Sequence, residues 1–182
     1  MPDEAMWETF FDPAAILDML GMRDPAADIV EFGCGYGTFT LAAAAGIKGT
    51  VHAFDIDPAM LEATRAKLEE AKLANVILGQ RDFIANGSGL PNSSVDTAFL
   101  FNILHGDDPI SLLREAYRIL RPNGKVGVIH WQPDPTTPRG PDMAIRPRPE
   151  QCRDWIGEAG FGSVSHEIDL PPYHFGVTGL KA

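Results

Sequence analysis

The sequence is poor in cysteine and in basic residues, and it lacks a long apolar segment. Its two cysteines, Cys34 and Cys152, supply neither a disulfide framework nor a Cys-x-x-Cys metal motif. The 15 Lys and Arg residues stand against 25 Asp and Glu, for a net charge of −10. This balance disfavours a nucleic-acid-binding surface, because phosphate contacts need clustered cations.

No apolar run reaches the roughly 18 residues that a membrane-spanning helix needs. The acidic start of the chain is unlike a signal peptide. We therefore expect a cytoplasmic protein that acts on a small molecule or a protein, with no metal, membrane or nucleic acid as partner.

The length of 182 residues and the content of 45% hydrophobic and 22% charged residues are typical of one globular domain, which we expect over residues 1–182. Five strand-like segments alternate with helical ones, and they are 28–32, 50–54, 76–79, 95–101 and 125–131. This alternation predicts an open parallel sheet with helices on both faces, an α/β/α sandwich of three layers. Two closing strands, 163–170 and 173–180, are so close in sequence that they should form a hairpin with one antiparallel strand.

Two further segments are predicted to cover the sheet. Residues 1–25 should form a helical arm that restarts at Asp12-Pro13, where the aspartate caps the helix and the proline takes its first position. Residues 132–149 are rich in proline and show no periodicity, which predicts a loop. The aromatic residues of the arm either pack on the core or close over a ligand as a lid.

A glycine-rich turn follows the first strand in the segment EFGCGYGTF, residues 31–39. Gly33, Gly35 and Gly37 let the backbone approach a ligand closely, because glycine has no Cβ. Dinucleotide binders favour G-x-G-x-x-G, a spacing that would need glycine in place of Thr38. Glu31 would repel a pyrophosphate but could receive a cationic amino group. The alternative is a tight turn with a purely structural role.

Polar side chains also follow the other strands, at the carboxyl ends where open α/β sheets bind ligands. Asp55 ends the second strand, where a carboxylate can accept both hydroxyls of a ribose, whereas Asp57 is expected to cap the next helix. Asp82 follows the third strand, and Asn102 and His105 follow the fourth. Together these positions predict one ligand site at this end of the sheet.

From about residue 26 to its end, the chain resembles the class I S-adenosylmethionine-dependent methyltransferases. The resemblance rests on EFGCGYGTF and AFDIDPAML, with support from RD (81–82), FNILH (101–105) and LLREAYRILRPNGKVGV (112–128). It implies a Rossmann-like fold with a seven-stranded, mostly parallel sheet whose last strand is antiparallel. It also implies in-line transfer of a methyl group to a small-molecule acceptor, with S-adenosyl-L-methionine as cofactor and S-adenosyl-L-homocysteine as product.

The resemblance further implies which residues hold the cofactor. They are Gly33, Gly35, Gly37, Glu31 and Asn102 at the methionine end, and Asp55, Ile56, Asp82 and Phe83 at the adenosine end. Glu31 would hold the amino group, and Asp55 the ribose hydroxyls. The cofactor supplies the reactivity itself, so an essential metal is not expected.

The acceptor side is less defined by the sequence. His105 and His130 are candidate general bases, because histidine titrates near neutrality, with a structural imidazole as the alternative for each. The residues expected to cover or bind the acceptor are Trp7, Phe11, Trp131, Arg139 and Arg146. The arginines indicate an acceptor with a carboxylate or phosphate.

Two rival functions remain at this point. One is a non-catalytic module that binds S-adenosylmethionine. The other is an NAD(P)-linked oxidoreductase, which the glycine spacing, Glu31 and the lack of a Tyr-x-x-x-Lys pair disfavour.

Overall fold

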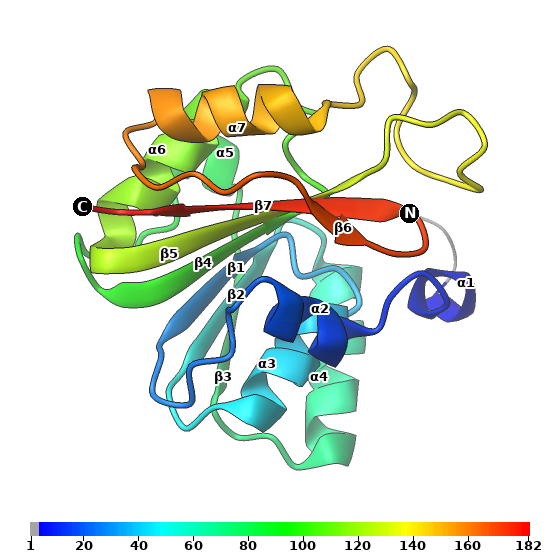
Figure 1. Ribbon diagram of the computed structural model, residues 1–182. Coiled ribbons are helices and arrows are strands. Elements are labelled where there is room, and N and C mark those ends of the chain that lie inside the picture. The colour runs from blue at the N-terminus through cyan, green and yellow to red at the C-terminus, as the bar shows by residue number, and fades with distance from the viewer. Residues whose placement is uncertain (1–3) are drawn as a thin grey trace.

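The structure, a computed structural model, describes residues 4–182, which form seven strands and seven helices (Figure 1). The strands are β1 (Ile29–Phe32), β2 (Val51–Asp55), β3 (Val76–Gln80), β4 (Val95–Phe101), β5 (Leu120–Trp131), β6 (Ile168–Leu170) and β7 (His174–Leu180). The helices are α1 (Glu4–Glu8), α2 (Pro13–Met19), α3 (Thr38–Gly46), α4 (Pro58–Ala71), α5 (Phe83–Asn86), α6 (Pro109–Ile119) and α7 (Pro149–Glu158).

All seven strands belong to one sheet with the order β3-β2-β1-β4-β5-β7-β6. Neighbours from β3 to β5 are parallel, whereas β7 is antiparallel to both β5 and β6. The predicted sheet, with its antiparallel last strand, is confirmed. The strand order reverses between β1 and β4, and open α/β sheets bind their ligands beside such a point.

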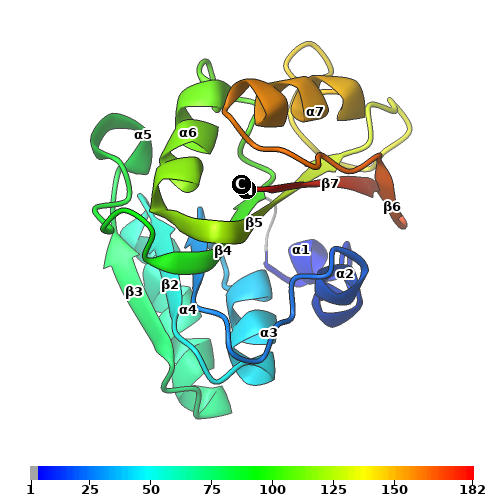
Figure 2. The ribbon, with the colours of Figure 1, turned by 60° about the vertical axis from the view of Figure 1, so that its left-hand side comes forward.

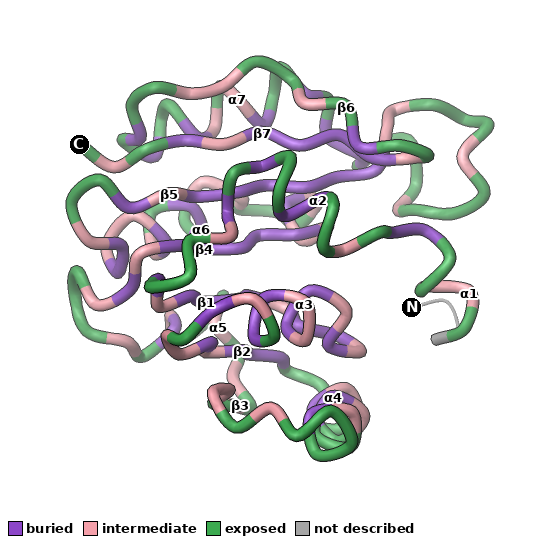
Figure 3. Tube along the Cα trace, turned by 60° about the horizontal axis from the view of Figure 1, so that its bottom comes forward, coloured by how far each residue is buried: buried purple, intermediate pink, exposed green. Residues whose placement is uncertain are grey.

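Helices cover both faces of the sheet. Helices α2, α3 and α4 lie on one face and α5, α6 and α7 on the other (Figures 1 and 2). Successive residues of a strand point to opposite faces, so Ile29 joins the apolar cluster of α2 and α3 while Val30 joins that of α6 and α7. The central strands β4, β5 and β7 are therefore buried along most of their length (Figure 3).

Two strand boundaries differ from the predicted ones, and one helix was not predicted. Strand β5 begins at Leu120, which pairs with Val95, rather than at residue 125 as predicted, and residues 121–124 form a bulge inside the strand. Strand β6 is shorter than predicted, because the Ser165 hydroxyl accepts a hydrogen bond from the Thr178 backbone N–H and so replaces a carbonyl of the ladder. The short helix α5, which the sequence did not predict, begins where the Asp82 carboxylate accepts a hydrogen bond from a backbone N–H.

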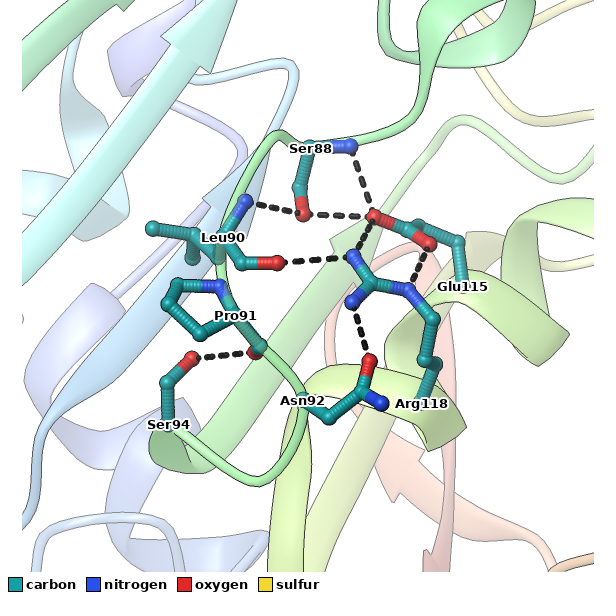
Figure 4. A network of polar contacts seen from close by, with 7 residues as sticks. All are labelled: Ser88, Leu90, Pro91, Asn92, Ser94, Glu115 and Arg118. Atoms are coloured by element: carbon teal, nitrogen blue, oxygen red, sulfur yellow. Dashed lines mark hydrogen bonds and ion pairs between the residues drawn. The ribbon is translucent and has the colours of Figure 1, made fainter.

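The loop after α5 is held to α6 by hydrogen bonds to Glu115 and Arg118, which form an ion pair within that helix (Figure 4). Glu115 accepts hydrogen bonds from the Ser88 N–H at 2.7 Å and the Ser88 hydroxyl at 2.6 Å, while Arg118 donates to the Leu90 carbonyl and to Asn92. Partial burial raises the pKa of Glu115, but the hydrogen bonds from Arg118 and Ser88 outweigh it and lower the pKa to about 2. The carboxylate is therefore ionised at neutral pH.

The N-terminal arm restarts as predicted, since the Asp12 carboxylate accepts a hydrogen bond from the Ala15 N–H at 3.0 Å and Pro13 begins α2. Of the predicted arm 1–25, residues 1–3 lie outside the described residues. No helix within residues 4–182 is long and apolar enough to cross a membrane.

Candidate functional site

Two neighbouring cavities open at the carboxyl ends of β1, β2 and β4. The first, of about 610 Å³, is lined by the glycine turn, the ends of β4 and β5 and part of the loop 132–149. The second, of about 340 Å³, is lined by the end of β2 and the start of α5. Gly33, Gly35 and Ile103 line both, so the cavities lie on either side of the glycine turn. Both volumes are typical of small-molecule sites, which range over roughly 300–1,000 Å³.

Gly33 and Gly37 of the turn have different roles. Gly33, which lines both cavities, has a φ of 77°, a conformation that favours glycine, and a Cβ there would come within 3.1 Å of Ile103. Gly37 lines neither cavity. It precedes α3 with a φ of 77°, and a Cβ there would come within 2.7 Å of Thr64. The ligand contact implied for Gly37 is thus not supported by its position, which serves packing.

Glu31 presents a buried carboxyl to the first cavity and is only 2% exposed. The Thr40 hydroxyl donates a hydrogen bond to it. Burial raises the pKa of Glu31 to about 8, the Thr40 bond opposes the rise, and the nearby charge of Asp55 adds to it. At neutral pH this carboxyl is therefore mostly protonated. Thr40 was not singled out by the sequence, because it reaches Glu31 only across the folded turn.

Asp55 ties the glycine turn to the end of β2. Its two carboxylate oxygens accept hydrogen bonds from the Gly35 N–H and the Asp57 N–H, both at 2.9 Å, and it lines the second cavity. Asp57 caps α4 as predicted, accepting from the Ala59 N–H at 2.8 Å.

Asn102 is the least satisfied polar residue of the first cavity. Its side-chain oxygen and nitrogen are both buried, and neither has a hydrogen-bond partner among the described residues. Its backbone has a φ of 59°, a conformation that few non-glycine residues adopt. A buried amide without partners costs free energy, and a polar ligand in the cavity would remove that cost.

Of the candidates for binding the adenine, Ile56 and Phe83 lie at the second cavity and Asp82 does not. Ile56 and Phe83 line it, and Ile56 is 60% exposed, so its side chain is open to a ligand there. Asp82 is exposed and lines neither cavity, because its carboxylate caps α5. Its implied contact with the adenine stays a prediction.

The two candidate bases lie in different places. His105 lines the first cavity, and burial lowers its pKa, so its imidazole is neutral at pH 7. His130 is fully buried and lines neither cavity, and its Nδ1 accepts a hydrogen bond from the Trp131 N–H at 3.0 Å. Burial is the main cause that lowers the pKa of His130 to about 3, and the neighbouring His105, His174 and Arg146 add to it. The catalytic role predicted for His130 is therefore not supported by its position.

Of the predicted lid residues Trp7, Phe11 and Trp131, two line the first cavity and one does not. Trp7 and Trp131 line the first cavity, and the Trp7 indole N–H donates a hydrogen bond to the Thr38 hydroxyl at 3.1 Å. Phe11 packs behind the wall instead, with its ring centroid 5.2 Å from that of Phe39. Phe39 and Phe101 also line the cavity, although the sequence did not single them out.

The arginines of the loop 132–149 have separate tasks. Arg139 is exposed and lines the first cavity. Arg146 is buried, and its guanidinium donates to the carbonyl oxygens of Gln132, Asp134, Arg139 and Pro141 and to the hydroxyl of Thr137. All three of its nitrogens are used to close the loop on itself, so the predicted binding of substrate by Arg146 is not supported.

Comparison with known proteins identifies the fold around these cavities. Residues 29–124 match the family model of the methyltransferase domain. The chain belongs to this methyltransferase family. The ribosomal protein L11 methyltransferase of Methylococcus capsulatus is 33% identical over 81% of this chain and 50% of its own length. The aklanonic acid methyltransferase of Streptomyces sp. strain C5 is 29% identical over 69% of this chain and 61% of its own length.

A solved structure shows the same fold. The crystal structure of an S-adenosylmethionine-dependent methyltransferase from Aquifex aeolicus superposes with a TM-score of 0.86 at 23% identity, covering 99% of this chain and 94% of its own. The cofactor of the family is S-adenosyl-L-methionine. This methyltransferase domain spans about half the length of the curated relatives that it matches.

Proposed function

We propose that this chain binds S-adenosyl-L-methionine across the two cavities and transfers its methyl group to a small molecule that enters the first. One observation carries the proposal: the buried Glu31 carboxyl and the unpartnered Asn102 amide both line the first cavity. Asp55 lies on the other side of the glycine turn. A ligand with a cationic amino-acid end and a ribose suits this separation.

The residues present fit the two ends of that cofactor. Glu31 would accept hydrogen bonds from the ammonium group, and Asn102 would pair its amide with the polar methionine end. Asp55 keeps free lone pairs after binding two N–H groups, so it could accept the ribose hydroxyls. Ile56 and Phe83 offer apolar surfaces for the adenine.

The bound sulfonium supplies an activated methyl group with a neutral thioether as leaving group. The chain then has to align the acceptor and exclude water, which can supply several kcal/mol of the barrier. Trp7 and Trp131 form apolar walls for this purpose. His105 is neutral and lines the cavity, so it could take the proton of a hydroxyl acceptor as the new bond to carbon forms.

Calorimetric titration with S-adenosylmethionine, S-adenosylhomocysteine, NAD and NADPH tests the proposal. We expect the first two to bind wild type and Asp154→Ala, an exposed control on α7, and to bind Asp55→Ala at least tenfold more weakly. Binding of a dinucleotide alone would overturn the proposal. Cofactor binding without turnover of methyl-labelled S-adenosylmethionine on any acceptor would leave a non-catalytic binding module.

We also propose a cytoplasmic location and an anionic acceptor. The two cysteines are buried and unpaired, as is usual for proteins of reducing compartments. Arg139 supports the anionic acceptor, because it is the arginine of the loop 132–149 that lines the cavity.

A further inference from the structure

The wall of the first cavity is aromatic on several sides. Trp7 from α1, Phe39 from α3, Phe101 from β4 and Trp131 from β5 all line it. The rings also contact one another or a second layer, since Phe39 lies 4.7 Å from Phe101 and Trp7 lies 4.9 Å from Phe11, measured between ring centroids. The cavity thus has a continuous aromatic wall built from segments far apart in the sequence.

The tryptophan rings of this wall are held in place. The hydrogen bond from the Trp7 indole N–H to Thr38 fixes the first ring. The backbone of Gly140 lies against the second, since a Cβ at that residue would come within 3.0 Å of Trp131. Rings with fixed faces and edges select a planar aromatic partner over a flexible aliphatic one, because offset and edge-to-face contacts depend on orientation.

The acidic and basic side chains that line the first cavity are Glu31, His105 and Arg139. Glu31 lies beside the glycine turn, where the proposed cofactor would use it, and His105 is neutral at pH 7. Arg139 is the lining residue with a permanent positive charge, and its guanidinium has no ion pair within residues 4–182. A guanidinium with free N–H groups matches a carboxylate in a bidentate geometry.

We infer that the acceptor is a small planar aromatic acid, with its ring against the aromatic wall and its carboxylate paired with Arg139. The inference rests on the proposed function, because it takes the Glu31 end of the cavity to be filled by the cofactor. The cavity of about 610 Å³ must hold the methionine end as well, so the acceptor is a compact molecule of few rings.

Binding of three probes to the protein saturated with S-adenosylhomocysteine tests the inference. The probes are 2-naphthoate, its neutral analogue 2-naphthamide, and the non-aromatic cyclohexanecarboxylate. We expect 2-naphthoate to bind wild type at least tenfold more tightly than either of the others. Calorimetry gives the dissociation constants directly.

Two variants separate the charge from the ring. Arg139→Gln should weaken 2-naphthoate about tenfold and leave 2-naphthamide unchanged, whereas Arg114→Gln, at an exposed arginine of α6, should change neither. Trp7→Leu should reduce the advantage of 2-naphthoate over cyclohexanecarboxylate while keeping S-adenosylhomocysteine bound.

Two results would overturn the inference while the proposed function stands. They are equal affinities for the acid and its amide, and equal affinities for the aromatic and the non-aromatic acid, each with S-adenosylhomocysteine bound. Failure of S-adenosylhomocysteine itself to bind would overturn the proposed function, and the inference with it.

Discussion

The raised pKa of Glu31 predicts that cofactor binding releases a proton. In the free protein, a pKa of about 8 leaves about 0.9 of the Glu31 carboxyl protonated at pH 7. A cationic ammonium within hydrogen-bonding distance lowers a carboxyl pKa by about 1–3 units. With the largest of these shifts, Glu31 is fully ionised in the complex, and binding at pH 7 releases about 0.9 proton.

The same shift makes the affinity depend on pH. Between the bound and free pKa values, the dissociation constant should fall by about tenfold for each unit of rising pH, and level off above pH 8. Free-protein stability should change in the opposite direction. Because the folded pKa lies above the ordinary value of 4.5, stability falls by several kcal/mol as the pH rises from about 4.5 to 8.

Calorimetric titration of S-adenosylhomocysteine in buffers with different ionisation enthalpies measures the released protons. Glu31→Gln should remove the release due to Glu31, while Glu62→Gln, an exposed carboxylate on α4 paired with Arg65, should behave as wild type. This comparison cancels protons that the ligand itself exchanges. If wild type and Glu31→Gln release the same number of protons, then Glu31 either is ionised in the free protein or does not meet the ammonium.

The remaining predictions concern stability and cofactor binding. Gly37→Ala should lower the free energy of unfolding by about 2–5 kcal/mol, because a Cβ is strained at positive φ and meets Thr64. The control Gly157→Ala on α7, where a Cβ meets nothing within 4 Å, should raise the free energy of unfolding by up to about 1 kcal/mol. Urea unfolding measures both. Glu115→Gln should lower the free energy of unfolding by about 1–2 kcal/mol at pH 7. Because the pKa of Glu115 is lowered in the folded state, this difference from wild type should disappear as the pH falls from about 4.5 to 2. A constant difference over this range would contradict the assigned ion pair. Asp55→Asn should weaken S-adenosylmethionine by at least tenfold in calorimetry, and it should also lower the melting temperature of the free protein, because one of the two oxygens that accept the Gly35 and Asp57 N–H groups becomes a donor. Equal binding by wild type and the variant would exclude Asp55 as the ribose acceptor.

The sheet could be predicted from the sequence because its signals are local. Apolar runs of strand length, each followed by a polar residue or a glycine, define both the parallel strands and the edge where ligands bind. The end of β6 could not be predicted in the same way. There the Ser165 hydroxyl, rather than a backbone carbonyl, accepts the hydrogen bond from the Thr178 N–H. The pattern of apolar residues does not indicate this exchange.

The candidate site shows the same division between local and tertiary signals. Glu31, Asp55 and Asn102 lie at or just after the carboxyl ends of strands and were all predicted to face a ligand. The hydrogen bond from Thr40 to Glu31 and the contacts by which Arg146 closes its loop arise only from folding.

His130 is the instructive case, because the sequence did contain the reason for its burial. Adjacent residues of a strand point to opposite faces, so His130 and Trp131 are expected on opposite faces of the sheet. Trp131 packs in the cluster of α2 and α3, and the ring of His130 stacks near Phe175 in the cluster of α6 and α7. Once Trp131 is assigned to the wall of the cavity, alternation points His130 to the opposite face of the sheet, whereas His105 lies in the loop after β4 and is not subject to alternation.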